Sequence, residues 1–270
     1  METMQFQATA GNQAAASLQD KVAIVSGSCS GIGEAIAREL AARGAQVVVN
    51  YPFPQLESSA KAIVESLPTP CIAVEADLST TTGPGELVKQ TVAKFGRVNI
   101  LVNNAGAAVN LPLEEHTLAH WDKLVNLNGR GTFLLTKEVL PYLPKKEAGG
   151  GGRIVNIVSI SARAPPPHQT IYAGTKGMVE SFTRCWAKEL PPKYGCTVNA
   201  VSPGATRTPA FPERGSKEYE LLQPTIDGTP CGPRMRDPEE IAHAVVFLCE
   251  ERSRWINGTN IFVTGGLYVD

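Results

Sequence analysis

The sequence has 270 residues, of which 43% are apolar and 19% are charged, a balance that is typical of a globular core and excludes an intrinsically disordered chain. Its 25 Lys and Arg residues against 26 Asp and Glu residues give a net charge of -1, without blocks of like charge. This charge balance excludes a basic nucleic-acid-binding surface and a polybasic membrane patch. The sequence has neither an apolar run of ~18 residues nor a secretory signal, and we therefore expect a cytoplasmic protein.

Residues 1–17 predict a flexible polar tail, beyond which apolar, β-branched runs alternate with helical patterns. Runs without strict polar alternation predict strands that are buried on both faces. These strands are expected over residues 21–26, 46–50, 71–75, 99–103, 153–159, 197–202 and 260–264. Helices are expected over residues 31–44, 57–67, 85–96, 117–140, 172–190 and 237–251. The alternation indicates one α/β domain over residues 18–270, with a Rossmann-like, doubly wound parallel sheet of seven strands and helices on both faces.

Two stretches carry neither pattern. Residues 145–152 are rich in glycine and predict a flexible surface turn. Residues 203–237 hold many Pro and Gly residues, and a loop of this length in a compact domain predicts a lid or substrate loop.

His116 and His120 share a predicted helix face without a third ligand, and the six cysteines form no C-x-x-C pair. We therefore expect free thiols and no metal site.

The first predicted strand ends in a glycine-rich turn that leads directly into a helix. Gly27, Gly31 and Gly33 stand in G-x-x-x-G-x-G spacing. Glycines in such a turn allow the backbone to approach a pyrophosphate, whose charge is stabilised by the free amides and the dipole of the helix. The position of this motif predicts a dinucleotide site, although glycine-rich turns also serve packing alone.

The second predicted strand ends at Asn50 and Tyr51, where dinucleotide folds select their cofactor. An acid there would bind the adenosine ribose and repel a 2′-phosphate, whereas Asn50 is neutral. The sequence therefore favours NADP(H) over NAD(H). No Arg or Lys accompanies the two turns, so polar side chains are expected to meet the phosphate, namely Ser28, Ser30, Asn50 and Tyr51.

The sharpest chemical pattern is Tyr172 with Lys176 four residues later, on one face of a predicted helix. A nearby ammonium favours the phenolate and lowers the pKa of a tyrosine from its ordinary value of ~10. Such a tyrosine can exchange a proton with a carbonyl or alcohol oxygen. Ser159 ends the fifth predicted strand, where ligands meet an α/β sheet, and its hydroxyl can hold the same oxygen. Ser161 is a nearby rival for that role.

In this order and spacing, the motifs resemble the short-chain dehydrogenase/reductase family over nearly the whole chain from Ser17 to Gly266. The resemblance rests on Gly27-x-x-x-Gly31-Ile32-Gly33, Asp77-Leu78, Asn103-Asn104-Ala105-Gly106, Asn128, Ser159 thirteen residues before Tyr172, Lys176, and Pro203-Gly204 followed by Thr208. Each motif alone is weak, whereas the complete ordered set is highly specific. Segments 17–27, 47–51 and 172–185 are most similar to fungal NADPH-dependent naphthol reductases of polyketide pathways. Related 3-oxoacyl-carrier-protein reductases match somewhat less well.

The resemblance implies roles for the matched residues. Tyr172 would donate the proton in ketone reduction, and Ser159 would orient the carbonyl. Lys176 would bind the nicotinamide ribose and lower the tyrosine pKa. Asn128 would hold a relay water, although it could also only kink its helix. The implied cofactor contacts are Gly27, Ser28, Ser30, Gly31, Ile32, Gly33, Asn50, Tyr51, Asp77, Leu78, Asn104, Ala105, Gly106, Tyr172, Lys176, Pro203, Gly204, Thr206 and Thr208.

Three positions depart from the family pattern. Ser26 stands where threonine is common, and it keeps the hydroxyl. Ser30 stands where many NADP-dependent members carry arginine, which weakens the argument for NADP. Thr264 replaces the usual acid before Gly265-Gly266, where we expect an effect on structure and none on chemistry.

The substrate pocket is expected between two segments. Residues 164–168 predict a stiff, proline-rich border, at which His168 either contacts a phenolic or acidic group or faces solvent. Residues 209–237 offer apolar cover that suits a flat aromatic ketone or an acyl chain. The residues that provide this cover are Phe211, Tyr219, Leu221, Leu222 and Met235.

The sequence thus predicts an NADPH-dependent reductase that transfers hydride to a ketone of an aromatic or polyketide-derived small molecule in secondary metabolism. One alternative is a 3-oxoacyl-carrier-protein reductase or a general alcohol dehydrogenase. Others are a fold redeployed for non-redox cyclisation, dehydration or isomerisation, which the retained Tyr172 and Lys176 disfavour, and a non-enzymatic NADPH-binding regulator. By analogy with the family we expect a homotetramer, with the helices around 117–140 and 172–190 at its interfaces.

Overall fold

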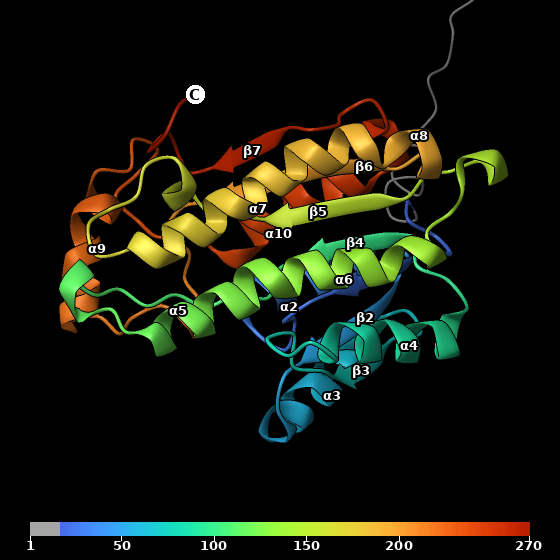
Figure 1. The fold of residues 1–270 in the computed structure, drawn as a ribbon, viewed down its shortest axis with the longest axis horizontal. Coiled ribbons are helices and arrows are strands. Elements are labelled where there is room, and N and C mark those ends of the chain that lie inside the picture. The colour runs from blue at the N-terminus through green and yellow to red at the C-terminus, as the bar shows by residue number, and fades with distance from the viewer. Residues whose placement is uncertain (1–16) are drawn as a thin grey trace, which may run out of the picture.

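The computed structural model describes residues 17–270, so residues 1–16 of the predicted tail lie outside the described residues. Seven strands form one parallel sheet in the order β3-β2-β1-β4-β5-β6-β7 (Figure 1). This topology confirms the predicted doubly wound, Rossmann-like fold. The strands are β1 (Val22–Val25), β2 (Gln46–Tyr51), β3 (Ile72–Glu75), β4 (Ile100–Asn103), β5 (Arg153–Ile157), β6 (Thr197–Pro203) and β7 (Asn260–Val263).

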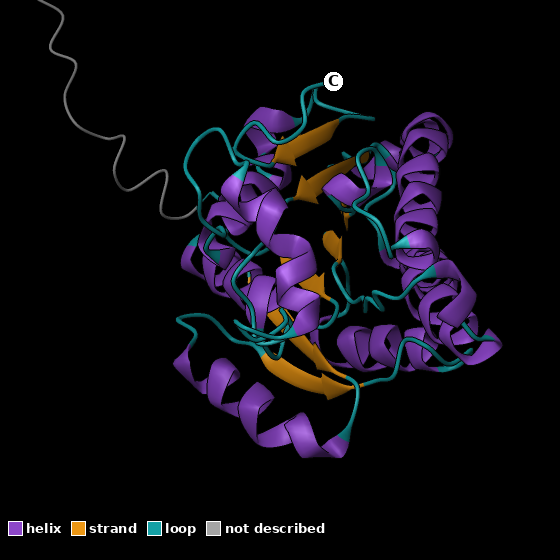
Figure 2. Cartoon of the chain, turned by 90° about the vertical axis from the view of Figure 1, so that its left-hand side faces the viewer, coloured by secondary structure: helices purple, strands orange, loops and turns teal. Residues whose placement is uncertain are grey.

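Helices cover both faces of the sheet, and the strands lie between them (Figure 2). The side chains of Ala23 and Val25 in β1 pack with α2, α3 and α10 on one face, while Ile24 packs with α4, α6 and α7 on the other. The inner strands are almost wholly buried, whereas the edge strands β3 and β7 are partly exposed. The helices are α2 (Gly31–Ala42), α3 (Glu57–Ser66), α4 (Gly83–Phe95), α5 (Leu118–Leu124), α6 (Thr132–Val139), α7 (Thr170–Glu189), α8 (Pro191–Tyr194), α9 (Lys217–Asp227) and α10 (Pro238–Cys249).

Local sequence signals set several helix ends. Helix α4 stops at Gly96, whose φ of 75° is the left-handed conformation that glycine adopts at low cost. Helix α10 begins with a capping box between Asp237 and Glu240, followed by Pro238 in the first turn. These signals explain why the two helices start or end close to their predicted positions.

Two predicted segments differ from the structure. The helix expected over residues 117–140 is divided, because a π-helical segment (Val125–Gly131) separates α5 from α6. Residues 203–237, expected as a loop, contain α9, which Ser216 caps by accepting a hydrogen bond from the Tyr219 amide at 3.1 Å. Pro224 inside α9 is the residue that made a helix there improbable from sequence, since proline lacks an amide donor.

Candidate active site

A cleft of about 1200 Å³ opens at the carboxyl ends of the strands, where doubly wound sheets bind their ligands. The topological switch point lies beside β1, which pairs with β2 on one side and β4 on the other. Turns that follow β1, β3, β4, β5 and β6 line the cleft, together with α7 and α9. All but three of the predicted catalytic and cofactor-binding residues line it, and the exceptions are Ser28, Tyr51 and Asn128.

The turn between β1 and α2 forms a cradle that side chains would fill. Gly27 and Gly31 have φ angles of 60° and 58°, which favour glycine. A Cβ on Gly33 would lie 2.4 Å from the Gly27 carbonyl oxygen, so only glycine fits there. Ser30 makes no side-chain cap for α2, and Gly31, Ile32 and Gly33 of its first turn line the cleft, with amides that have no partner within the helix. Such a cradle fits the pyrophosphate of a dinucleotide.

Ser26 joins this cradle to the turn that follows β4. Its buried Oγ accepts hydrogen bonds from the backbone amides of Asn104 and Ala105, both at 2.9 Å. The Asn104 side chain donates in return to the carbonyl oxygens of Ser26 and Gly27, at 2.9 and 3.0 Å. The hydroxyl that Ser26 shares with threonine is therefore used fully, which explains why this departure from the family pattern leaves the turn intact.

Two residues predicted to meet the adenosine phosphate are buried and do not line the cleft. Ser28 is fully buried, and its Oγ donates to the Val25 carbonyl at 2.7 Å and accepts from the Asn50 amide at 3.0 Å. Tyr51 is 5% exposed and lies outside the cleft. Asn50 reaches the cleft wall, but its side-chain amide is bonded to backbone groups on both sides of the strand end. Among the four predicted side chains, Ser30 alone is exposed at the cleft.

The adenosine end of the cleft contains an apolar pair that sequence reasoning missed. Phe53 and Leu56 follow β2, line the cleft, and are 52% and 36% exposed. The sequence signal for this pair was two apolar residues in a proline-containing turn directly after β2. Apolar side chains of this kind suit the face of an adenine ring. Asp77 and Leu78 line the same region, where Asp77 Oδ1 also accepts a hydrogen bond from the Ser79 amide at 2.8 Å.

Ser159, Tyr172 and Lys176 meet along the middle of the cleft. Ser159 follows β5, and its Oγ accepts a hydrogen bond from the Ser161 amide at 3.1 Å. Ser161, the predicted rival, therefore supports Ser159 through its backbone. Lys176 Nζ donates to the Ile157 carbonyl at 2.8 Å and lies 5.8 Å from the centre of the Tyr172 ring. The arrangement places a hydroxyl, a phenol and an ammonium on one wall.

Burial changes the proton affinity of both titratable groups. It raises the pKa of Tyr172 above its ordinary value, and hydrogen bonding with Ser159 offsets only part of this rise. It lowers the pKa of Lys176 to about 8. The net pKa of Tyr172 is therefore raised, because desolvation of the phenolate is the largest effect, and the predicted lowering of this pKa by Lys176 stays a prediction. Tyr172 keeps its proton at neutral pH, which suits a proton donor.

Asn128 lies in the π-helical segment and stabilises the walls of the cleft. Its Oδ1 accepts from the Ala107 amide and its Nδ2 donates to the Ala107 carbonyl, both at 2.9 Å. The same Nδ2 donates to Thr175 Oγ1 at 3.0 Å, beside Lys176. The side-chain amide thus has protein partners on both of its atoms, and its predicted role with a relay water stays a prediction.

Residues 203–208 complete the wall opposite the glycine turn. Pro203, Gly204, Thr206 and Thr208 line the cleft, as predicted for contacts with the nicotinamide end. Arg236, which sequence reasoning missed, lies behind them with 5% of its surface exposed. A Cβ on Gly204 would lie 2.5 Å from Arg236 Nη1, so the bare glycine makes room for a buried guanidinium.

The end of the cleft where the substrate is expected lies between the loop that precedes α7 and the segment that contains α9. Ala164, Pro166 and Gln169 line one side, and Phe211 and Leu222 line the other. Of the remaining predicted residues, Tyr219 and Met235 line a smaller neighbouring cavity of about 520 Å³. His168 and Leu221 line neither space, and His168 is only partly exposed.

Within residues 17–270, no three His, Cys, Asp or Glu side chains are grouped to hold a metal ion. No helix in the same range has the length and apolar character needed to cross a membrane.

Comparison with known proteins gives consistent matches. A family model described as Enoyl-(Acyl carrier protein) reductase matches residues 27–268. The Short-chain dehydrogenase/reductase FrzI of Cladobotryum sp is 38% identical over 255 residues, covering 93% of this chain and 97% of that protein. The Hydroxynaphthalene reductase arp2 of Aspergillus fumigatus is 34% identical over 254 residues, covering 89% and 90%. A short chain dehydrogenase from Burkholderia cenocepacia, solved in complex with NADP, has a TM-score of 0.83 and 32% identity, covering 93% and 98%.

Proposed function

Because the chain belongs to the short-chain dehydrogenase/reductase family, whose members are oxidoreductases acting on CH–OH and C=O groups, we propose that it reduces a ketone of an aromatic or polyketide-derived substrate with NADPH. The observation that carries this proposal is the convergence of Ser159, Tyr172 and Lys176 on one wall of a cleft whose other end is a phosphate cradle. Neither a regulator nor a non-redox enzyme needs this combination.

The side chains divide the chemistry between them. NADPH, when bound, supplies a hydride to the carbonyl carbon. The Ser159 hydroxyl donates a hydrogen bond that orients the carbonyl oxygen. Tyr172 gives its phenolic proton to that oxygen as the alcohol forms, and water then reprotonates the phenolate. Lys176 holds a positive charge near the phenol, which stabilises the phenolate that remains.

The preference for NADPH over NADH rests on the end of β2. Asn50 carries no charge that would repel a 2′-phosphate, and Ser30 is exposed beside the α2 amides. An added cation should strengthen this preference, since guanidinium groups pair well with phosphate. We expect Ser30→Arg to lower the Kd for NADPH about fivefold and to leave the Kd for NADH unchanged, as measured by fluorescence titration. An equal effect on both cofactors would contradict binding of the 2′-phosphate at this site.

The substrate class is supported by the shape of the substrate end and by one relative. Phe211 and Leu222 provide apolar cover over the cleft, which suits a flat ring system. The similarity to a hydroxynaphthalene reductase points to an aromatic ketone, and a role in secondary metabolism is part of the proposal. A 3-oxoacyl thioester is the second candidate, because the same apolar cover also suits an acyl chain.

The test is NADPH oxidation by the purified protein against hydroxynaphthalenones, anthraquinones, simple ketones and 3-oxoacyl thioesters. We expect turnover of a hydroxylated aromatic ketone, and a loss of at least about 100-fold in kcat in Tyr172→Phe. Turnover that survives this substitution would contradict the proposed chemistry. NADPH binding without turnover of any compound would instead favour a regulator or a non-redox enzyme.

Three further expectations remain predictions. Residues 18–270 are proposed to act as one catalytic domain, and the chain is proposed to form a homotetramer in the cytoplasm. Analytical ultracentrifugation of the purified protein tests the assembly directly, because a monomer of this mass sediments clearly apart from a tetramer.

A further inference from the structure

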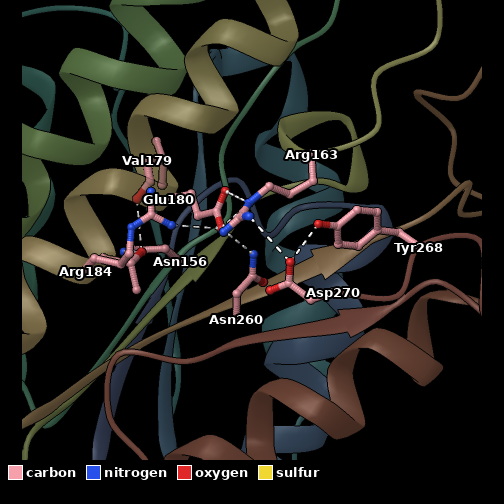
Figure 3. Close-up of polar contacts among 9 residues, drawn as sticks. Asn156, Arg163, Val179, Glu180, Arg184, Asn260, Tyr268 and Asp270 are labelled. Carbon is pink, nitrogen blue, oxygen red and sulfur yellow. Dashed lines mark hydrogen bonds and ion pairs between the residues drawn. The ribbon is translucent and has the colours of Figure 1, made fainter.

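A cluster of charged side chains lies beside the catalytic wall and joins three segments that are distant in sequence. Figure 3 shows Glu180 of α7 at its centre, with Arg163 and Arg184 pointing toward its carboxylate. Asn260 of β7 donates to the same carboxylate at 3.3 Å. Asp270 lies on the far side of Arg163 and also accepts a hydrogen bond from the Tyr268 hydroxyl at 2.7 Å.

The contact between Arg163 and Glu180 is bidentate. Arg163 Nη2 donates to Glu180 Oε1 at 2.7 Å, and Arg163 Nε donates to Oε1 and Oε2 at 2.9 and 3.0 Å. The contact with Asp270 is longer, at 3.5 Å, and more exposed. Only 4% of the Glu180 side chain is exposed, against 35% for Arg163. A planar guanidinium that pairs with both oxygens fixes the relative orientation of its two segments.

The pair connects the two segments that carry the reacting groups. Arg163 lies four residues after Ser159, directly behind the short 3-10 turn Ile160–Ala162. Glu180 lies on the face of α7 that also carries Tyr172 and Lys176, because residues four and eight positions apart share a helix face. The ion pair is thus a side-chain link between the far end of the Ser159 turn, residues 159–163, and α7, in addition to the hydrogen bond between Tyr172 and Ser159.

The electrostatics show why Glu180 stays ionised and keeps Arg163 as its partner. Burial alone would raise the pKa of the Glu180 carboxyl, but hydrogen bonds from Arg163 and Asn260 outweigh it and hold the pKa below its ordinary value. The same pairing raises the pKa of Arg163. A buried carboxylate that loses its partner is strongly destabilised, so the carboxylate keeps the guanidinium in place.

We propose that Arg163 and Glu180 are positioning residues, whose ion pair holds the Ser159 hydroxyl at the distance from Tyr172 that the reaction needs. The inference rests on the proposed function, because it assigns Ser159 and Tyr172 to one carbonyl oxygen. Neither residue touches the substrate or cofactor in this account. Arg184 provides the matched control, since it donates to Glu180 Oε1 at 3.1 Å but comes from α7 itself and links no second segment.

The first experiment compares kinetics and stability in Arg163→Met, Glu180→Met, their double variant and Arg184→Met. We expect about a tenfold lower kcat in both single variants with an unchanged Kd for NADPH, because small misplacements of catalytic groups are costly. Arg163→Lys, which keeps the positive charge but loses the bidentate geometry, should recover part of the loss. Arg184→Met should retain the wild-type kcat.

The double variant separates positioning from stability. The double variant contains no unpaired buried carboxylate, unlike Arg163→Met, so its Tm should recover toward the wild-type value while kcat stays low. Recovery of kcat together with Tm would overturn the proposal, because the pair would then act through stability alone. An equal loss of kcat in Arg184→Met would also overturn it.

Hydrogen–deuterium exchange of residues 159–164 tests the link without substrate. The turn is held by hydrogen bonds from the Ala162 amide to the Ser159 carbonyl, at 3.0 Å, and from the Arg163 amide to the Ile160 carbonyl, at 2.9 Å. Arg163→Met should accelerate exchange of these amides, whereas Arg184→Met should not. Unchanged exchange in Arg163→Met would contradict the link even if the protein reduces no ketone, so failure of this inference is distinguishable from failure of the proposed function.

Discussion

The cofactor half and the substrate half of the cleft are built by different means. The cofactor half consists of strand-end turns in which glycines leave the backbone accessible, and these turns are held by the hydroxyl of the buried Ser26 and the side-chain amide of the half-buried Asn104. The substrate half consists of one loop on the side of Pro166, and of the segment that contains Phe211 and helix α9 on the other side. The sheet therefore fixes the first half, whereas contacts between side chains define the second.

This difference indicates how tolerant each half is to change. A substitution in the cofactor half meets backbone, which moves only with the sheet. A substitution in the substrate half meets loop side chains, which can adapt. We therefore expect the largest losses from the glycine turn and the smallest from the lid segment, our name for residues 209–228 within the stretch 203–237 that was predicted as a lid or substrate loop.

The largest effect is expected from Gly33→Ala. The added Cβ would lie 2.4 Å from the Gly27 carbonyl oxygen and 2.5 Å from the Asn104 side chain, so the turn must shift. We expect the Kd for NADPH, measured by fluorescence titration, to rise more than about 100-fold, because the pyrophosphate cradle is lost. Gly85→Ala in α4 is the control, since its nearest neighbour is 3.9 Å away, and it should leave binding unchanged.

A strong pH dependence is expected from Lys176. Its folded pKa of about 8 means that the ammonium is lost above this pH, so kcat should fall about tenfold per pH unit there while Tyr172 still holds its proton. Between about pH 8 and 10.5 the unfolded lysine binds a proton that the folded one does not, so its contribution to stability rises with pH. A fall in kcat that coincided with unfolding, followed by circular dichroism, would therefore contradict this assignment.

A moderate effect is expected from Ser26→Ala. The substitution leaves the half-buried backbone amides of Asn104 and Ala105 without their partner. We expect the free energy of unfolding to fall by about 2 kcal/mol and the Kd for NADPH to rise about tenfold. Ser26→Thr keeps the hydroxyl and should stay near wild type in urea denaturation. A threonine variant as weak as the alanine variant would show that volume matters more than the hydrogen bonds.

The smallest effect is expected in the lid segment. Phe211→Ala removes part of the apolar cover and should raise the KM for an aromatic ketone about fivefold, without changing the Kd for NADPH. Leu221→Ala is the control, because Leu221 is 45% exposed and does not line the cleft. Equal changes in KM for the two variants, measured in steady-state assays, would remove Phe211 from the substrate end.

The sheet and most of the cofactor half were predictable because they depend on local patterns. β-branched runs located all seven strands, and glycine spacing located the cradle. The sequence does not show whether a serine side chain points into the protein or toward the cleft. Ser28, whose hydroxyl is buried and donates to the Val25 carbonyl, was therefore not distinguished from the exposed Ser30. The π-helical segment was missed because a periodic pattern does not show the Asn128 contacts with Ala107 and Thr175.

The substrate half was less predictable because its determinants are tertiary. Helix α9 was not predicted, because Pro224 lies inside it. Of the five apolar residues predicted to cover the substrate, only Phe211 and Leu222 line the cleft. Arg163 and Glu180 are 17 positions apart in the sequence. They meet because the chain turns back after β5, so that α7 packs beside the turn that carries Arg163. A charge pattern in sequence does not reveal such a pair, since most charged side chains are solvated.

The most direct test of the central claim follows deuterium into the product from NADPH that carries deuterium at both C4 positions of the nicotinamide. With a hydroxynaphthalenone as substrate, the account predicts one deuterium on the new carbinol carbon, detected by mass spectrometry, and at least about 100-fold less labelled product with Tyr172→Phe. Product without deuterium, or equal labelling by the variant, would contradict reduction through Tyr172.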